Sequence, residues 1–298
     1  MSSAENRNAE NSNAAKAKAS LDPRVRVGDV AWRHIEAEYA DVIDDIVETL
    51  APDEPFAYTV APYPTTDSSI PRQEIATTRD QIRAAYENLH RFTQVRRLQP
   101  ITEIRGDWYM FAHGMGEGLI KQTGQIVSAP TVVIFPTMGT SGITGELIWT
   151  RSASGAPYTG DRQGPFAAEL AIIERHDLLL NHLRSGDAES AASLLHPGAQ
   201  TAIRDYVDDT GTLVALHSAT DFKAYIDRFF ARFRVVELSV VNRTAGDWFV
   251  FAELFWVVEE KATPAKRYRF VTAEQAEVRP DGLFAARIGH GTDLFETK

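Results

Sequence analysis

The sequence contains no cysteine. This absence excludes disulfide bonds, thiol nucleophiles, iron–sulfur clusters and cysteine zinc sites together. Basic residues are the minority, since 31 lysines and arginines stand against 41 acidic residues and leave a net charge of −10. Non-specific nucleic-acid binding needs basic patches, so no nucleic-acid partner is expected. No stretch approaches the roughly 20 apolar residues of a membrane span, so we expect no membrane partner and a cytoplasmic location.

Small and polar residues dominate the first 22 positions, which hold no apolar run. Such a segment buries too little apolar surface to offset the entropy of ordering it, so residues 1–22 are predicted to be a disordered tail. A secretory signal peptide needs an apolar central region, and none is present here.

In the rest of the chain, the sequence predicts the same order of helices and strands in each of two halves. In the first half, apolar residues at helical spacing predict a helix over 29–50, with Asp29 as its N-cap, and a second helix over 80–90. A strand is predicted at 56–60, then a long loop at 61–78 that holds three prolines and is a candidate lid, and four strand-like runs end near 151. After a linker rich in Gly, Ser and Pro (153–164), helices at 166–183, 188–195 and 221–233 and further strands follow. This order is typical of the α+β class.

An internal repeat explains this order. The segment Gly106–Ala112 (GDWYMFA) recurs 140 residues later as Gly246–Ala252 (GDWFVFA). Ser141-Gly142 and Asp281-Gly282 have the same spacing. We interpret the chain as two copies of one domain, over residues 23–152 and 165–298.

Several short motifs of the second half occur in an order that is typical of one protein family. Leu183–Asp187 (LRSGD) ends a long helix, Leu194–Ala199 (LLHPGA) leads into a strand, and Asp221–Ile226 (DFKAYI) opens another helix. In these features the half resembles the nuclear-transport-factor-2-like superfamily, which includes SnoaL-like polyketide cyclases and ketosteroid isomerases. The first half is similar more loosely, through Asp80–Tyr86 and its Gly-Asp-Trp strand. The resemblance implies two tandem cone-shaped domains, each a curved antiparallel sheet packed with about three helices around a deep apolar pocket.

The resemblance also implies places for an acid and a base. The aspartate base of the isomerases corresponds to Ile203 in the second half and to a position near Tyr58 in the first. Their oxyanion-stabilising acid corresponds to Glu274 and to Ile134. Burial would keep Glu274 protonated and able to donate a hydrogen bond. Because neither half holds the matched pair, ketosteroid isomerisation itself is not expected.

His113 is the residue best suited to proton transfer near neutral pH. Side chains alternate along a strand, so His113 shares one face with Tyr109, Phe111 and Glu117. If this face points into the cone, His113 forms an acid–base pair with Tyr58 or Glu117. The alternative is a histidine satisfied by its neighbours or placed at a domain interface.

The remaining candidates are predicted to bind substrate. They are ionisable or aromatic residues on the first helix and on the strands: His34, Tyr39, Tyr109, Phe111, Arg204, Glu253 and Trp256. No metal site is predicted, because His290 and Asp293 lack a third ligand at a recognisable spacing.

Two functions remain open at this stage. The first is a cofactor-independent acid–base enzyme (a lyase, dehydratase, isomerase or cyclase) acting on a small hydrophobic, polyketide-, terpenoid- or steroid-like molecule. The second is a non-catalytic binding or assembly protein, in which the two copies form a pseudo-dimer. Members of the superfamily often pair through the outer face of the sheet, so the resemblance implies the sheet faces as a candidate surface for a homo-oligomer. Two intact pockets favour the enzyme, and pockets filled by their own aromatic side chains favour the second function.

Overall fold

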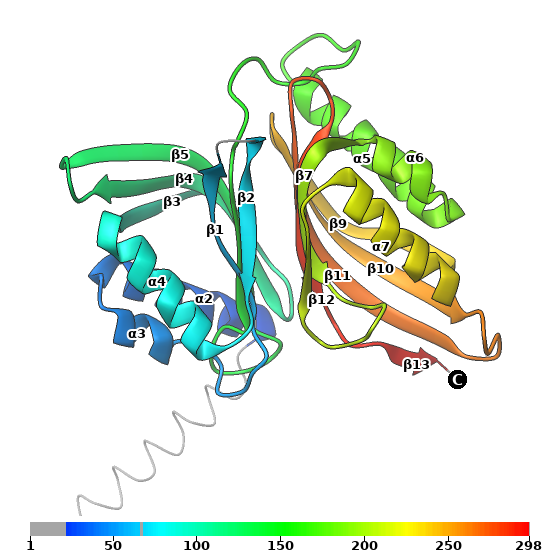
Figure 1. Cartoon of the computed structure of the whole chain (residues 1–298), viewed down its shortest axis with the longest axis horizontal. Coiled ribbons are helices and arrows are strands. Elements are labelled where there is room, and N and C mark those ends of the chain that lie inside the picture. Colours follow the sequence, from blue (N-terminus) through cyan, green and yellow to red (C-terminus); the bar gives the residue numbers. More distant parts are fainter. Residues whose placement is uncertain (1–21, 66–67, 298) are drawn as a thin grey trace, which may run out of the picture.

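The computed structural model describes residues 22–65 and 68–297 (Figure 1). All but Asp22 of the tail predicted at 1–22 lies outside the described residues. The two halves of the described chain lie side by side, with their sheets facing each other and their helices on the outer sides. Both halves belong to the α+β class, as the sequence predicted.

The first half holds a six-stranded sheet in the order β2-β1-β6-β5-β4-β3. All neighbours are antiparallel except β1 and β6, which run parallel. The strands are β1 (Ala57–Thr65), β2 (Ser68–Ala76), β3 (Thr93–Arg105), β4 (Tyr109–Ile120), β5 (Gln125–Pro136) and β6 (Gly145–Thr150). The helices are α2 (Pro23–Ala40), α3 (Ile43–Glu48) and α4 (Arg79–Phe92).

The second half repeats this topology in the order β8-β7-β12-β11-β10-β9, with β7 parallel to β12. A short strand, β13 (Phe295–Thr297), adds to β11. The other strands are β7 (Leu195–Arg204), β8 (Leu213–Leu216), β9 (Phe233–Ala245), β10 (Phe249–Glu260), β11 (Arg267–Val278) and β12 (Phe284–Gly291). The helices are α5 (Ala167–Ser185), α6 (Ala188–Ser193) and α7 (Ala219–Arg232). Three helices and one curved sheet per half agree with the predicted architecture.

The helix predicted at 29–50 is wrong at both ends. The first helix begins at Pro23, because proline suits the first helical position and the Asp22 side chain accepts a hydrogen bond from the backbone N–H of Arg24. It ends at Ala40, because Asp41 after it has a positive φ of 59°, and the separate α3 begins at Ile43.

The loop predicted at 61–78 is also wrong, since most of it is strand. The chain forms the hairpin β1–β2, paired from Tyr58↔Ala76 to Thr65↔Ser68 with two register shifts. Prolines 62, 64 and 71 are tolerated because β2 is an edge strand and because β1 pairs with β6 only at Ala57 and Tyr58. Among the described residues of this segment, no long loop therefore remains to act as a lid.

The two halves are held together by a core of their own. The rings of Phe111 and Phe251, which occupy equivalent positions, stack with centroids 4.2 Å apart. Around this pair the contacts are reciprocal: Tyr109 packs on Phe251, and Phe111 packs on Phe249. This is the pattern of a two-fold interface, made here within one chain.

Polar contacts reinforce this core. Trp149 Nε1 donates to Glu277 at 2.6 Å, and Gln275 Nε2 donates to the carbonyl of Leu147 at 2.8 Å. The outer sheet faces of the two halves thus cover each other within one chain, so these faces are not exposed for pairing with a second copy.

Among the described residues, no helix is long and apolar enough to cross a membrane.

Candidate functional site

A cavity of about 630 Å³ lies between the helices and the sheet of the first half. Its walls are mostly apolar, with Ile35, Leu89, Val133 and Ile148 among the lining residues. Its closed end is polar, because four ionisable side chains meet there: Glu38, Tyr58, Tyr86 and Glu146. Ligand cavities typically measure about 300–1,000 Å³ and place a few polar groups in an apolar wall, so this cavity has the size and character of a binding site.

Neighbouring elements bring this cluster together. His34 and Glu38 are four residues apart on α2 and therefore share one face of the helix. The parallel pairing of β1 with β6 places Tyr58 beside Glu146. Tyr86 comes from α4, whose N-terminus is fixed by a capping box at Thr78.

Tyr86 lies at the centre of the cluster. Its hydroxyl is 2.5 Å from Glu38 Oε1, 3.2 Å from Glu146 Oε2 and 3.2 Å from His34 Nε2. The Tyr58 hydroxyl lies close to both the Glu146 carboxyl group and the Tyr86 hydroxyl and donates its one proton to Glu146. One hydroxyl therefore bridges two carboxyl groups and an imidazole, at the end of a cavity that leads to solvent.

The two carboxyl groups of the cluster compete for one proton. Burial, together with the negative charge of Glu146, raises the pKa of Glu38 well above its usual range. Burial and the same carboxylates also raise the pKa values of Tyr58 and Tyr86. Glu38 therefore keeps its proton to higher pH than an exposed glutamate does, and the two phenols keep theirs at neutral pH.

The raised pKa of Glu38 makes the stability of the protein depend on pH. Because the folded state binds the Glu38 proton more tightly than the unfolded chain does, the free energy of unfolding falls as pH rises from about 4.5 through the raised pKa. In Glu38→Gln this contribution is absent, so the variant should lose less stability between about pH 5 and pH 8. Urea unfolding of both proteins across this range measures the difference. Parallel curves would contradict a shared proton at Glu38.

His34, Glu38 and Glu146 are also the residues with the spacing of a metal site, since one ligand atom of each lies within 4.8 Å of the others. The carboxylate oxygens of this trio are already hydrogen-bonded to the hydroxyls of Tyr58 and Tyr86. The same three residues therefore belong to the hydrogen-bonded cluster.

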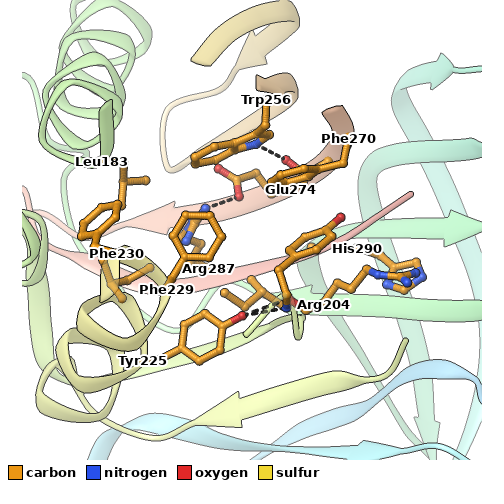
Figure 2. Close-up of a pocket in the computed structure, with 15 residues that line it drawn as sticks. Leu183, Arg204, Tyr225, Phe229, Phe230, Trp256, Phe270, Glu274, Arg287 and His290 are labelled. Atoms are coloured by element: carbon orange, nitrogen blue, oxygen red, sulfur yellow. Dashed lines mark hydrogen bonds and ion pairs between the residues drawn. The ribbon is translucent and has the colours of Figure 1, made fainter. Parts of the chain in front are cut away.

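The cone of the second half is almost filled by its own side chains. Its cavity measures only about 50 Å³. Figure 2 shows the rings of Phe229, Phe230, Trp256 and Phe270 closing around this space. Trp256 is held there by a hydrogen bond from Nε1 to Thr272, 3.1 Å long. A cavity of this size cannot hold a molecule that would fill the first cone.

The charged groups of the second cone neutralise each other. Arg287 donates to Glu274 at 2.6 Å (Figure 2), and His176 Nε2 lies 3.7 Å from the same carboxylate. Burial alone would raise the pKa of Glu274, but Arg287 and His176 outweigh it and lower the pKa. The prediction of a protonated, hydrogen-bond-donating Glu274 is therefore wrong.

The repeat allows the two cones to be compared position by position. Arg33 and Arg175 bind the equivalent carbonyls of Ser141 and Gly282, which aligns His34 with His176. Strand pairing and helix position align the rest of the cluster as follows: Glu38 with Leu180, Tyr58 with Thr201, Tyr86 with Ile226, and Glu146 with Arg287. The same pairing aligns Glu274 with Val133 and not with Ile134. Only the histidine is common to both cones.

The structure separates the residues predicted to be catalytic. Tyr58 is at the closed end of the first cavity, and Glu117 is among the lining residues of its wall. His113 instead packs between the halves, with its ring 4.4 Å from that of Phe249, because this face of β4 points toward the second half. His113 and Tyr58 therefore do not form the predicted pair, and His113 occupies the interface position of the alternative interpretation.

The predicted substrate-binding residues divide in the same way. His34 belongs to the cluster, and Tyr39 lines the cavity while its hydroxyl accepts from the backbone N–H of Leu98 at 2.7 Å. Tyr109, Phe111 and Glu253 lie between the halves, where Tyr109 donates to Glu253 at 3.0 Å; they are interface residues because they share the outward face of β4 and β10.

Arg204 and Trp256 line the small second cavity. Arg204 is engaged by Asp293 at 2.5 Å, so the predicted role in binding a substrate anion is filled by a residue of the chain.

The sequence analysis did not identify Glu38, Tyr86 and Glu146 as site residues. One signal was available, because Glu38 follows His34 by one helical turn on a buried face. Tyr86 and Glu146 carry no such local signal, since they reach the cluster only through the packing of α4 and β6.

No protein-family model matches the chain, and no curated protein sequence does either. Among solved structures, an LEH-like epoxide hydrolase from M. tuberculosis matches with 14% identity and a TM-score of 0.35, over 42% of this chain and 84% of its own. The epoxide hydrolase/cyclase-like enzyme SalBIII matches with 13% identity and a TM-score of 0.36, over 43% of this chain and 97% of its own.

An NTF2-like protein from Burkholderia xenovorans LB400 matches with 10% identity and a TM-score of 0.34, over 42% of this chain and 91% of its own. Each match therefore spans about one half of the chain. Each half packs three helices on one sheet with the same strand order, which agrees with the architecture that the resemblance in the sequence implied.

Proposed function

We propose that the first half is an acid–base enzyme that moves protons on a small hydrophobic molecule, with side chains of this chain as its acid and base. The observation that carries the proposal is the pair Glu38 and Glu146, which share hydrogen bonds with two tyrosines at the closed end of an apolar cavity. Paired carboxyl groups in different protonation states are a recurring arrangement in acid–base catalysis.

Each group of the cluster has a distinct role in this proposal. When Glu146 accepts a proton from the substrate, the single Tyr58 proton is released from its hydrogen bond to Glu146. Tyr58 then donates this hydrogen bond to the oxygen on which negative charge develops. Protonated Glu38 returns a proton to the substrate. Because Tyr86 touches both carboxyl groups, it resets the site by accepting the proton from Glu146 while giving its own to Glu38.

This cycle consumes and produces no net proton, so it suits isomerisation, elimination of water and cyclisation alike. The cavity of about 630 Å³ matches a polyketide-, terpenoid- or steroid-like substrate with an apolar body and an oxygen at its buried end. The exposed ring of Phe92 and side chain of Val127 at the rim extend the apolar path to solvent.

The second half fits the other candidate function, that of a non-catalytic partner. Its cavity measures about 50 Å³, and its Glu274 is neutralised by Arg287. We propose that it supports the first half through the shared interface core and turns over no substrate of its own. In this proposal the chain combines one catalytic half with one half that only stabilises it.

A substrate screen tests the proposed activity. Wild type and Glu146→Gln are incubated in D₂O with apolar enolisable ketones, β-hydroxy ketones and epoxides, and proton NMR follows deuterium uptake and product formation. We expect wild type to act on at least one class and Glu146→Gln to fall by about 10²–10⁴-fold, which is the usual contribution of a general base. Equal rates in the two proteins would refute the assigned role of Glu146.

A further inference from the structure

Thr49, which follows α3, has a hydroxyl that touches two partners. Its Oγ1 is 2.5 Å from the backbone carbonyl of Ile46 and 2.5 Å from His34 Nδ1. A carbonyl oxygen only accepts, and a hydroxyl has one proton to give. The Thr49 proton therefore goes to Ile46, and Thr49 Oγ1 is left as an acceptor for His34.

His34 must then carry a proton on Nδ1. In the neutral imidazole the other nitrogen, Nε2, becomes an acceptor. This nitrogen faces the cluster, 3.2 Å from the Tyr86 hydroxyl. The Tyr86 proton can point to His34, which leaves the Tyr86 oxygen free to accept from Glu38 at 2.5 Å.

We propose that Thr49 sets the direction of the proton chain in the first cone, by holding His34 in its Nδ1–H tautomer so that the transferable proton rests on Glu38. In this proton chain Glu38 donates to Tyr86, and Tyr86 donates to His34. His34 in turn donates to Thr49, which donates to the Ile46 carbonyl. Tyr58 donates separately to Glu146. Thr49 is a positioning residue, since it contacts the cluster only through His34.

The groups around the cluster agree with this order. His34 and Glu38 face it from α2, Tyr86 from α4, Tyr58 from β1 and Glu146 from β6, and no lysine or arginine is among these five. None of these five side chains carries a permanent positive charge to stabilise a second carboxylate, so one acid keeps its proton. The raised pKa of Glu38 identifies that acid.

The second cone shows the opposite arrangement around the equivalent histidine. His176 Nδ1 lies 3.4 Å from Arg243 Nη1, and a guanidinium only donates. His176 therefore carries its proton on Nε2, which points to Glu274 at 3.7 Å. The Nδ1–H tautomer of His34 therefore lies beside Glu38, whose pKa is raised. The Nε2–H tautomer of His176 lies beside Glu274, whose pKa is lowered.

This inference rests on the proposed function for its catalytic meaning, but its test needs no turnover. In ¹⁵N-histidine-labelled protein at neutral pH, NMR distinguishes the two tautomers by the very different shifts of protonated and unprotonated ring nitrogens. We expect His34 as Nδ1–H and His176 as Nε2–H in the same spectrum. His34 found as Nε2–H would overturn the inference even if the enzyme were active.

Substitution of Thr49 provides the second readout. In Thr49→Val the acceptor is lost, so His34 should change to Nε2–H and the ¹³C titration midpoint of the Glu38 carboxyl should fall. Thr49→Ser keeps the hydroxyl and should restore both signals to those of wild type. Unchanged signals in a folded Thr49→Val protein would overturn the role of Thr49. If the tautomers are as expected and no substrate is turned over, the proposed function fails and the proton order stands.

Discussion

Tyr58→Phe should lower turnover of any substrate found by about 10²–10³-fold while the protein stays folded. The Tyr58 hydroxyl lines the cavity and is hydrogen-bonded to Glu146, and its raised pKa keeps it a donor. Removal of one donor from a developing oxyanion typically has an effect of this size. The loss should appear in kcat, because the hydrogen bond strengthens only as negative charge develops.

A matched control comes from the second cone. Tyr206 is also buried, and its hydroxyl donates to the backbone carbonyl of Thr292 at 2.9 Å. Tyr206→Phe removes a phenol of the same kind from the small cavity and should leave kcat within about twofold, since no group there takes part in the reaction. If Tyr206→Phe lost activity as strongly as Tyr58→Phe, the assignment of the active cone to the first half would be wrong.

Phe251→Ala should destabilise the whole chain by about 3–5 kcal/mol, the usual cost of truncating a buried phenylalanine. Phe251 is fully buried in the interface core and stacks on Phe111. The two halves should lose stability together, because the cavity opens in the core that they share. Urea unfolding followed by tryptophan fluorescence measures the change, and Phe111→Ala with the double variant gives the coupling between the rings.

Phe166 supplies the control for this experiment, since its ring is exposed. Phe166→Ala should change the free energy of unfolding by less than about 0.5 kcal/mol. A loss below about 1 kcal/mol for Phe251→Ala would mean that the halves do not depend on their common core.

The fold could be predicted from the sequence because the repeat consists of short motifs whose residues are neighbours along the chain. The Gly-Asp-Trp strands at Gly106 and Gly246 and the alternating apolar residues after them define equivalent strands without any knowledge of packing. The exceptions have local causes. Pro62 and Pro64 argued for a loop, but the strand that holds them lacks a partner on one side at those positions.

The site was harder to predict, since strand alternation tells which residues share a face but not what that face meets. His113, Tyr109 and Phe111 do share a face, and that face meets the other half of the chain. Because the second half packs on this face, His113 is a residue of the interface between the halves. Tyr58 was found because its position in the first strand is close to that of the family's base, whereas Glu146 reaches the cluster only through parallel pairing with β1.

Ligand stoichiometry tests most directly whether the first cone, and not the second, binds a substrate-like molecule. The probe is 2-naphthol, a flat apolar phenol whose hydroxyl can replace a substrate oxygen and whose fluorescence reports its surroundings. We expect one molecule to bind per chain, with affinity about tenfold weaker in Tyr58→Phe and unchanged in Tyr206→Phe, as loss of one buried hydrogen bond predicts. Two molecules per chain, or binding that is weakened by Tyr206→Phe and not by Tyr58→Phe, would contradict binding in the first cone alone.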